Sequence, residues 1–516
     1  MAKPQHNQQG FWIGIDIGGT FTDFVVYSSS DQSLQRLKIL STPADPAEAV
    51  LQGLTKFSQL ASRHIVHGST VATNAILERK GARTALIATK GFRDVLLIGR
   101  QDRPELYDLF PSIPPPLVPR EWCWEITERM DYEGNIVTPL QENELDGIIK
   151  ELKSQNIQSV AVSFLFSFVN PGHEQWVTNR LRAEGLFVTA SSEILPEFRE
   201  YERTSTTVVN AYVSPILDTY LGRLEREMTP TEFHILQSNG GRLSVSQARG
   251  HGVRSILSGP AGGVVGARYL AGLAGFNRLL TFDMGGTSTD VSLVHEEIRV
   301  TSEAEIGGCP IRVPVIDIHT VGSGGGSMAA VDAGGNLRVG PQSAGADPGP
   351  VCYGRGGRIP TVTDAHVVLR RLPTYGFLGG QMPLDIEAAV QAFDEFSRQI
   401  SLPFSSELDI RQNLALGMIQ IANAHMERAL RVISVERGED PREAVLVSFG
   451  GAGGLHACDL ARAMGVPYVL VSPMAATLSA LGMLAADVQL DYVHTIMLPN
   501  ETPFERLEQH TTELVR

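Results

Sequence analysis

A glycine-rich octad that occurs twice constrains this chain more than any other feature of its sequence. DIGGTFTD spans residues 16–23 and DMGGTSTD spans residues 283–290, and both follow the frame D-x-G-G-T-x-T-D. Each octad stands between two apolar runs, which predicts a strand–turn–strand unit at both places. Two such units separated by about half of the chain indicate duplicated α/β halves and not a short-period repeat.

The residue types of the octad favour phosphate binding. Paired glycines permit backbone conformations that are closed to other residues, and they expose N–H groups towards an anion. Threonine hydroxyls add further donors. The predicted phosphate-binding residues are Gly18, Gly19, Thr20 and Thr22 in the first octad and Gly285, Gly286, Thr287 and Thr289 in the second. A tight hairpin without a ligand is the alternative for one octad alone, and the match between the two disfavours it.

The aspartate that leads each octad has a different predicted role. Asp16 and Asp283 stand at strand ends, where a carboxylate would repel a phosphate. A carboxylate in that place can hold Mg2+ or a metal-bound water, because Mg2+ binds through one or two carboxylates together with substrate phosphates. We therefore predict both aspartates as catalytic and metal-binding residues, with Asp283 orienting the metal or the nucleophile.

The rest of the chain reads as mixed helix and strand in a duplicated α/β fold. Apolar spacing and capping signals predict strands at 11–17 and 23–27, a helix that begins at Asp45 and Pro46, a helix over 141–154 and a buried strand over 157–166. Residues 320–360 are rich in Gly, Ser and Pro and are predicted to be mostly loop. We divide the chain into an N-terminal domain (1–200), a core domain (201–497) and the start of a truncated C-terminal segment (498–516).

The order of these motifs resembles the nucleotide site of the actin, sugar kinase and chaperone ATPase superfamily. In that plan two hairpins hold the phosphates and a metal across a cleft, and a later glycine turn packs on the adenosine. The third element here is SFGGAGGLH at 448–456, an ordinary strand-to-helix turn being its alternative. The resemblance implies adenosine contacts from Gly450, Gly451, Gly453 and Gly454. Small-residue helices at 258–267 and 475–486 would cross where the halves hinge.

A second group of polar residues is a candidate substrate site. HGSTVATN at 67–74 follows an apolar strand and precedes a predicted helix, so that Ser69, Thr70 and Asn74 could recognise a small ligand. Arg100, Asp102 and Arg103 could bind a carboxylate or a carbonyl group. A surface loop with Ser69 or Thr70 capping the helix is the alternative.

A further constellation could bind a second divalent metal. Asp317 and His319 stand two apart on a predicted strand and so point to one face, as two metal ligands must, and His456 follows later in the chain. A hydrogen-bonded Asp–His pair, or unrelated polar residues, is the alternative. Asp347 and Asp364 are acidic loop residues, for which we expect turn capping.

Composition excludes several classes of function. The net charge of −14 and the lack of a long Lys/Arg cluster disfavour nucleic-acid binding. Four widely spaced cysteines without a CxxC pair indicate reduced thiols. We find no signal peptide and no run of about 20 apolar residues, and therefore expect a cytoplasmic protein without a membrane span.

Longer segments narrow the resemblance to the hydantoinase A/5-oxoprolinase family. They run in the same order from about residue 12 to 490 and comprise DIGGTFTD, the segment at 67–109, ILSGPAGGVVGA, FDMGGTSTD, SAGADPGPVCYG at 343–354, PTVTDA at 360–365 and SFGGAGGLHA. The resemblance implies ATP and Mg2+ as cofactors, a hydantoinase B-type partner subunit and an oligomer. Members of the family usually continue into a further C-terminal domain.

This resemblance predicts an ATP-dependent hydrolase subunit that phosphorylates the carbonyl oxygen of a cyclic amide, such as a hydantoin, 5-oxoproline or a lactam, for ring opening. The alternative within the family is a subunit of an acetone or acetophenone carboxylase type, with a ketone as substrate. A sugar kinase would not explain the segments at 67–109 and 343–354. A non-catalytic actin-like ATPase regulator would turn over ATP without dependence on a small molecule.

Overall fold

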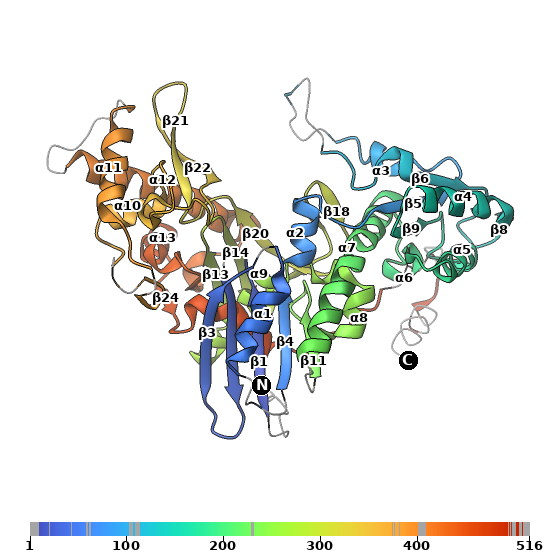
Figure 1. The fold of residues 1–516 in the computed structure, drawn as a ribbon, viewed down its shortest axis with the longest axis horizontal. Helices are drawn as coiled ribbons and strands as arrows, with labels where there is room; N and C mark the ends of the chain where they lie inside the picture. Colours follow the sequence, from blue (N-terminus) through green and yellow to red (C-terminus); the bar gives the residue numbers. More distant parts are fainter. Residues whose placement is uncertain are drawn as a thin grey trace.

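In the computed structural model, the described part of the chain forms three larger β-sheets and four two-stranded ones, with helices packed against them (Figure 1). The structure describes residues 10–19, 21–42, 44–57, 60, 63–102, 107–108, 114–228, 232–373, 375, 377–380, 382–400, 409–493, 495, 497, 502–504 and 508. In this part of the chain no helix has the length and apolar character that a membrane crossing requires.

The first sheet is built around the first octad. Its six strands have the order β12-β11-β4-β1-β2-β3. β1 and β2 form an antiparallel hairpin, and β4 lies parallel to β1 on the other side. The strands are β1 (Phe11–Ile17), β2 (Phe21–Ser28), β3 (Leu34–Leu40), β4 (Arg63–Ser69), β11 (Glu232–Leu236) and β12 (Arg242–Ser244).

A second six-stranded sheet repeats this arrangement around the second octad. β13 and β14 form the hairpin, and β23 lies parallel to β13 in the place that β4 takes beside β1. The strands are β13 (Arg278–Met284), β14 (Thr289–His295), β15 (Glu297–Ile298), β20 (Ile318–Val321), β23 (Val445–Phe449) and β24 (Tyr468–Val471). The expected duplication of α/β halves is therefore confirmed in strand order and direction.

A four-stranded parallel sheet forms a separate lobe, on the right of Figure 1. Its order is β10-β9-β5-β6, with β5 (Thr84–Thr89), β6 (Cys123–Ile126), β9 (Ser159–Ser163) and β10 (Phe187–Ala190). α4 (Glu142–Ser154) and α5 (Gly172–Ala183) cover it with Leu145, Leu152, Val177 and Leu181. The predicted helix at 141–154 and the buried strand after it are both confirmed.

Small two-stranded ladders complete the strands. They are β7 (Arg129–Met130) with β8 (Ile136–Thr138), β16 (Val300–Thr301) with β19 (Val315–Ile316), β17 (Ala304–Ile306) with β18 (Cys309–Ile311), and β21 (Ser327–Val331) with β22 (Leu337–Ser343). The region 320–360 is mostly loop as expected, but it also contains the β21–β22 hairpin. Its turn at Asp332–Asn336 contains Gly334 and Gly335, and the Asp332 carboxylate accepts from Asn336 N at 2.9 Å. These are ordinary hairpin-turn residues.

The remaining helices are α1 (Pro46–Thr55), α2 (Val71–Leu77), α3 (Val95–Ile98), α6 (Ser191–Ile194), α7 (Glu200–Met228), α8 (Val245–Gly250), α9 (Ser258–Leu273), α10 (Val362–Val368), α11 (Ile386–Ser397), α12 (Ile410–Ile433), α13 (Ala457–Met464) and α14 (Leu478–Ala485). Most of these helices pack on the two large sheets, whereas α3, α6 and part of α7 pack against the four-stranded sheet. α1 begins at Pro46 as predicted, but the Asp45 carboxylate does not cap it. That carboxylate instead accepts from Arg223 Nη1 at 2.6 and 2.8 Å, because α7 passes beside it.

α9 and α14 cross between the two halves, as their small residues predict. A Cβ atom at Gly482 would collide with the carbonyl oxygen of Gly262, and one at Gly266 would lie 2.6 Å from Leu478 O. The two helices share a core with strands of both large sheets, including Val25 and Val66 of the first and Val447 of the second. The first sheet also includes β11 and β12, which lie beyond residue 200. The division of the chain into domains at residue 200 stays a prediction.

Candidate active site between two glycine hairpins

The two octads fold into the same hairpin. In the first, Asp16 lies opposite Asp23, and Gly18 N donates to Phe21 O at 2.9 Å. In the second, Asp283 lies opposite Asp290, and Gly285 N donates to Ser288 O at 3.0 Å. The repeat in sequence is therefore a repeat in structure, down to the register of the strands and the turn hydrogen bond.

The two leading carboxyl groups share one electrostatic environment. Burial raises the pKa of Asp16 to about 7, with a smaller contribution from Asp23 and an opposing one from Lys38. Burial also raises the pKa of Asp283 to about 8, and the negative charges of Asp290 and Asp16 add to this. The charge of Asp16 reaches Asp283, so the two carboxyl groups, far apart in the sequence, lie within electrostatic range of each other.

This pair of carboxyl groups fits a cation. The Asp16 residue is partly exposed, but its Oδ1 atom is buried and has no hydrogen-bond partner. A buried carboxylate oxygen without a partner is costly unless a ligand or an ion satisfies it. A divalent cation would supply the missing partner and the missing positive charge, with Asp16 and Asp283 as its protein ligands.

The glycine-rich loop at 323–326 supports the second hairpin. Gly325 N donates to Gly285 O at 3.0 Å and Gly326 N donates to Gly286 O at 2.6 Å. A Cβ atom at Gly324 would lie 2.7 Å from Gly286 O, so only glycine permits this approach. The SGGG stretch at 323–326, which belongs to the predicted loop region 320–360, therefore holds a phosphate-loop candidate in place.

The threonines of the octads divide into two groups. Thr22 and Thr289 are fully buried and face the protein interior, where Thr22 Oγ1 lies 3.0 Å from Ser41 Oγ and Thr289 Oγ1 donates to Ser323 O at 2.5 Å. Their predicted phosphate contact is replaced by a structural role, because strand alternation turns them inward. Thr287 is exposed at the turn. Thr20 lies outside the described residues.

The third glycine turn lies beside the second hairpin. Ala452 N donates to Met284 O at 3.0 Å, directly after Asp283. Gly450 has φ of +79°, and a Cβ atom there would collide with Asp283 Oδ1. A Cβ atom at Gly453 would lie 2.9 Å from Ser448 Oγ, whereas Gly451 and Gly454 face open space. The strand, turn and helix predicted for 448–456 are confirmed, and adenosine contact stays a prediction.

The predicted second metal site is not assembled. Asp317 forms an ion pair with Arg437, which follows α12, while His456 Nδ1 bonds Asn423 Oδ1 at 2.6 Å and its Nε2 lies 3.1 Å from His366 Nε2. His319 belongs to β20 and pairs with Val291 in the sheet. Throughout the described residues, no three His, Cys, Asp or Glu side chains gather as metal ligands. The two-residue spacing predicted a shared face, but long-range partners engage Asp317 and His456 separately.

The capping role expected of Asp364 is confirmed. Thr361 and Asp364 form a reciprocal capping box at the start of α10, and the Asp364 carboxylate also accepts from Cys352 N at 2.8 Å. The PTVTDA segment at 360–365 thereby ties the loop at 350–352 to α10. Thr363 N at the same turn donates to Gly325 O at 2.7 Å, which links this segment to the loop behind the second hairpin.

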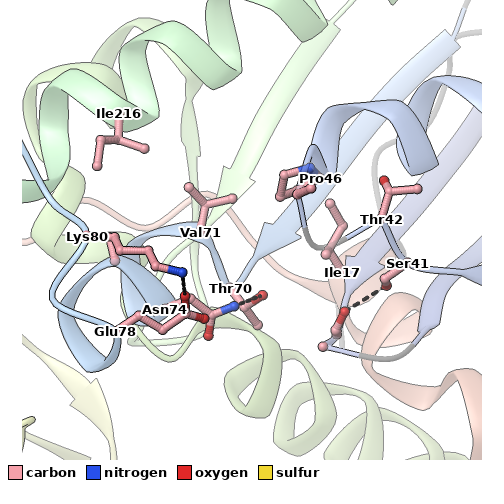
Figure 2. A pocket seen from close by; sticks show the side chains of 14 residues that line it. Ile17, Ser41, Thr42, Pro46, Thr70, Val71, Asn74, Glu78, Lys80 and Ile216 are labelled. Atoms are coloured by element: carbon pink, nitrogen blue, oxygen red, sulfur yellow. Dashed lines mark hydrogen bonds and ion pairs between the residues drawn. The ribbon is translucent and has the colours of Figure 1, made fainter. Parts of the chain in front are cut away.

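A cavity of ≈ 310 Å³ adjoins the first hairpin (Figure 2). Its lining residues are Ile17, Gly18, Gly19, Ser41, Thr42, Ala44, Pro46, Thr70, Val71, Asn74, Ala75, Glu78, Lys80 and Ile216. Figure 2 shows Thr70, Val71, Asn74, Glu78 and Lys80 on one side and Ile17, Ser41, Thr42 and Pro46 on the other. Two predicted substrate residues, Thr70 and Asn74, are thus brought next to Gly18 and Gly19.

The other predicted substrate residues lie away from this lining. Ser69 is buried, and its hydroxyl accepts from Val71 N at 3.2 Å at the start of α2, so it has a capping role. Arg100 forms an ion pair with Glu202 of α7. Asp102 is exposed and is not among the lining residues. Arg103 lies outside the described residues.

Two residues near the site escaped the sequence interpretation. Lys38 Nζ bonds the Asp23 carboxylate at 2.7 Å and Ala476 O at 3.1 Å, which connects the first hairpin to the turn before α14. His67 is fully buried and lies 3.1 Å from Ile15 O and 2.8 Å from the Tyr220 hydroxyl. Burial lowers the pKa of His67 to about 4, so its imidazole is neutral beside the strand that carries Asp16. Nothing in the sequence marks a strand lysine as part of a site.

The fold and the site together define an α/β protein of duplicated halves, each with a glycine hairpin led by a buried carboxyl group. A model of the hydantoinase/oxoprolinase family matches residues 203–492, and a model of that family's N-terminal region matches residues 12–185. The chain belongs to the hydantoinase/oxoprolinase family.

Individual relatives agree with this assignment. An uncharacterised protein of Methanocaldococcus jannaschii is 39% identical over 98% of this chain and 77% of its own length. Caprolactamase subunit alpha of Pseudomonas jessenii is 37% identical over 98% of this chain and 74% of its own length. 5-Oxoprolinase 1 of Arabidopsis thaliana is 36% identical over 92% of this chain, which spans only 41% of that protein.

Two solved structures share the fold. The ATP-dependent caprolactamase from Pseudomonas jessenii superimposes with a TM-score of 0.85 at 35% identity, covering 98% of this chain and 75% of that one. Nucleotide-free acetone carboxylase superimposes with a TM-score of 0.80 at 28% identity, again over 98% of this chain and 75% of that one.

Proposed function

We propose that this chain is the ATP-dependent subunit of an enzyme that phosphorylates the carbonyl oxygen of a small cyclic amide and so prepares the ring for hydrolysis. The observation that carries this proposal is the adjacency of two features. The Asp16 and Asp283 carboxyl groups belong to two glycine hairpins at one site, and the ≈ 310 Å³ cavity with Thr70 and Asn74 borders the first of these hairpins. Relatives named caprolactamase and 5-oxoprolinase support the same chemistry.

The reaction would proceed by phosphoryl transfer to oxygen. The amide carbonyl oxygen attacks the γ-phosphorus of ATP, and ADP leaves. Water then adds to the carbon of the resulting imidate phosphate, the ring nitrogen departs as an amine, and a second water releases phosphate from the acyl phosphate. An unactivated amide resists the addition of water, so phosphorylation supplies a better electrophile.

The chain's own part in this chemistry is positioning and electrostatics. The N–H groups of Gly19 and Gly286 suit the phosphates, whereas those of Gly18 and Gly285 close the hairpin turns, and Asn74 suits the amide. Asp16 and Asp283 would hold Mg2+, which neutralises phosphate oxygens when bound. Gly451 and Gly454, where a Cβ atom would meet nothing within 4 Å, would suit the adenosine.

We further infer a hydantoinase B-type partner subunit that completes hydrolysis, in a hetero-oligomer located in the cytoplasm. The support is that the relative from Pseudomonas jessenii is named subunit alpha.

A second candidate function is a carboxylase that activates a ketone, which the TM-score of 0.80 to acetone carboxylase favours. Both functions use the same nucleotide site and differ in the acceptor.

The test is a measurement of ADP release with ATP and Mg2+ in the presence of hydantoin, 5-oxoproline, 2-pyrrolidinone, ε-caprolactam, or acetone with bicarbonate, with and without the partner. Stimulation by one or more cyclic amides, together with formation of the ring-opened acid, is the expected result. Stimulation by acetone with bicarbonate alone would transfer the assignment to the carboxylase class. ATP turnover that no compound stimulates, even with the partner present, would contradict both.

A further inference from the structure

The cavity beside the first hairpin contains two charged side chains, and they neutralise each other. Of the fourteen lining residues that the structure describes, only Glu78 and Lys80 carry charge. Lys80 Nζ lies 2.8 Å from Glu78 Oε2, and both side chains are largely exposed, at 76% and 53%. An exposed ion pair is weak, so its strength matters less than its zero net charge.

The polar groups of the cavity wall are already partly used by the protein. Ser41 Oγ donates to Gly18 O at 2.7 Å, and Thr42 Oγ1 donates to Asp45 O at 2.5 Å. Asn74 is different, because its Nδ2 makes only a long contact of 3.4 Å with Thr70 Oγ1. The Asn74 carboxamide is therefore the polar group best able to turn towards a ligand.

The chemistry of Asn74 matches a cyclic amide. A small lactam ring holds its amide in the cis form, which places the N–H donor and the carbonyl acceptor side by side on one edge. A carboxamide presents a complementary acceptor and donor, so the two can form a paired hydrogen bond. The remaining wall is apolar and suits ring methylene groups, with Ile17, Ala44, Pro46, Val71, Ala75 and Ile216.

The surroundings disfavour a substrate that carries a carboxylate. Such a substrate would place its negative charge beside the first hairpin, where the proposed function puts the triphosphate of ATP and where Asp16 directly precedes the lining residue Ile17. Like charges placed together in a binding site weaken binding unless a cation offsets them. The one cation of the described lining, Lys80, already faces Glu78.

We propose that the substrate of this chain is an uncharged cyclic amide, and that the Glu78–Lys80 pair is a specificity determinant that excludes carboxylated rings. The proposal rests on the function proposed above and narrows its range of substrates. Within the cyclic amides, it assigns simple lactams to this chain and removes 5-oxoproline from its preferred substrates.

A matched pair of compounds tests this directly. 2-Pyrrolidinone and 5-oxoproline have the same five-membered lactam ring and differ only in the carboxylate. With ATP, Mg2+ and the partner subunit present, kcat/KM for ADP release is expected to be at least about tenfold higher for 2-pyrrolidinone, a difference of about 1.4 kcal/mol. Equal or higher kcat/KM for 5-oxoproline would overturn the proposal.

Variants of the pair test the assigned residues. Glu78→Gln leaves Lys80 free, so the ratio of kcat/KM for 5-oxoproline to that for 2-pyrrolidinone is expected to rise about three- to fivefold, and less at high salt. Lys80→Gln should lower the same ratio. Glu184→Gln is the control, because Glu184 pairs with Lys153 on the separate lobe, 2.6 Å away, and the ratio should stay constant. A ratio that Glu78→Gln leaves unchanged removes the pair from the explanation.

The outcomes separate this inference from the function on which it rests. If 5-oxoproline is the better substrate, the chain is still an ATP-dependent cyclic amidase and only the neutral-substrate inference fails. If neither compound stimulates ADP release while other cyclic amides are also inactive, the proposed function itself fails.

Discussion

The residue with the sharpest expected effect is Asp283. Its carboxyl group is desolvated, its pKa is raised to about 8, and it lies within the influence of Asp16. Asp283→Asn keeps the shape of the side chain and removes its charge, so cation-dependent ATP turnover should be lost while the fold is retained. Because a desolvated charge is destabilising, the thermal midpoint of unfolding should stay the same or rise. ADP release and thermal unfolding, measured together, check this.

A matched control for Asp283 is available in the same half of the molecule. Asp317 carries the same functional group but pairs with Arg437 and belongs to no cluster of metal-ligand side chains in the described part of the chain. Asp317→Asn should therefore retain turnover. Full activity of the Asp283 variant would remove that residue from the mechanism, and loss of activity in the Asp317 variant would reopen the metal site that the structure does not assemble.

Two buried histidines give the protein a predictable response to acid. Burial lowers the pKa of His366 to about 3 and that of His456 to about 4, so both are neutral in the fold and titrate at their ordinary values when unfolded. The unfolded chain therefore takes up protons first, and stability falls as pH drops below about 6.5, by about 1.4 kcal/mol per pH unit for each histidine.

The His366→Gln variant isolates this effect. It keeps an N–H donor for His456 Nε2, which lies 3.1 Å from His366 Nε2, and it removes one titrating group. The slope of unfolding free energy against pH between 6.5 and 4 should be smaller by about 1.4 kcal/mol per pH unit than in the parent chain. Denaturant unfolding at several pH values measures it, and parallel slopes in variant and parent would contradict the assignment.

At the scale of elements, the crossing of α9 and α14 depends on glycine. A Cβ atom at Gly482 would collide with Gly262 O, a backbone atom that can move only if the helices separate. Gly482→Ala is therefore expected to destabilise the protein by about 1–3 kcal/mol. Gly147→Ala in α4 is the control, because a Cβ atom there meets nothing within 4 Å and should stabilise the helix by about 0.5–1 kcal/mol.

The second hairpin offers a test that separates binding from folding. A Cβ atom at Gly286 would meet no protein atom within 4 Å, and its φ is not in the left-handed region, so the fold accepts a side chain there. Gly286→Val should leave unfolding unchanged and weaken nucleotide binding about tenfold or more, because the side chain occupies the surface where backbone N–H groups meet phosphate. Calorimetric titration with ATP and Mg2+ measures it, and unchanged affinity would remove this loop from the site.

At the scale of the whole molecule, Lys38 connects the first hairpin to the opposite half. Its Nζ bonds the Asp23 carboxylate at 2.7 Å and the carbonyl of Ala476 at 3.1 Å. Lys38→Met would leave the Asp23 carboxylate, which is only 14% exposed, without its cation. We expect a loss of about 1–3 kcal/mol in unfolding free energy and weaker nucleotide binding, since the halves lose a link beside the site. Unfolding and binding that both match the parent would refute this.

Local signals predicted much of what surrounds the site. The octads were recognised because a repeated glycine pattern needs a repeated backbone shape, and the hairpins have matching register. The crossing helices were recognised from their small residues. The Asp364 capping box was recognised from turn chemistry alone. Each of these depends on residues that are neighbours along the chain.

The errors have a common physical cause. Thr22 and Thr289 were assigned to phosphate, but strand alternation places them in the core. Asp317 and His456 were grouped as metal ligands, but Arg437 and Asn423 engage them separately. The partners in these pairs come from elements distant in sequence, and no pattern along the chain records which of them will meet.

The α/β class, the duplication, both phosphate-loop candidates and the family can all be inferred from the sequence, because glycine freedom, strand alternation and helix capping act over a few residues. Three features become visible only in the folded chain. Asp16 lies within electrostatic range of Asp283, Lys38 joins the halves, and Thr70 and Asn74 line a cavity with the neutral Glu78–Lys80 pair. Those facts depend on the packing of elements hundreds of residues apart, which hydrophobic burial and close helix crossing impose.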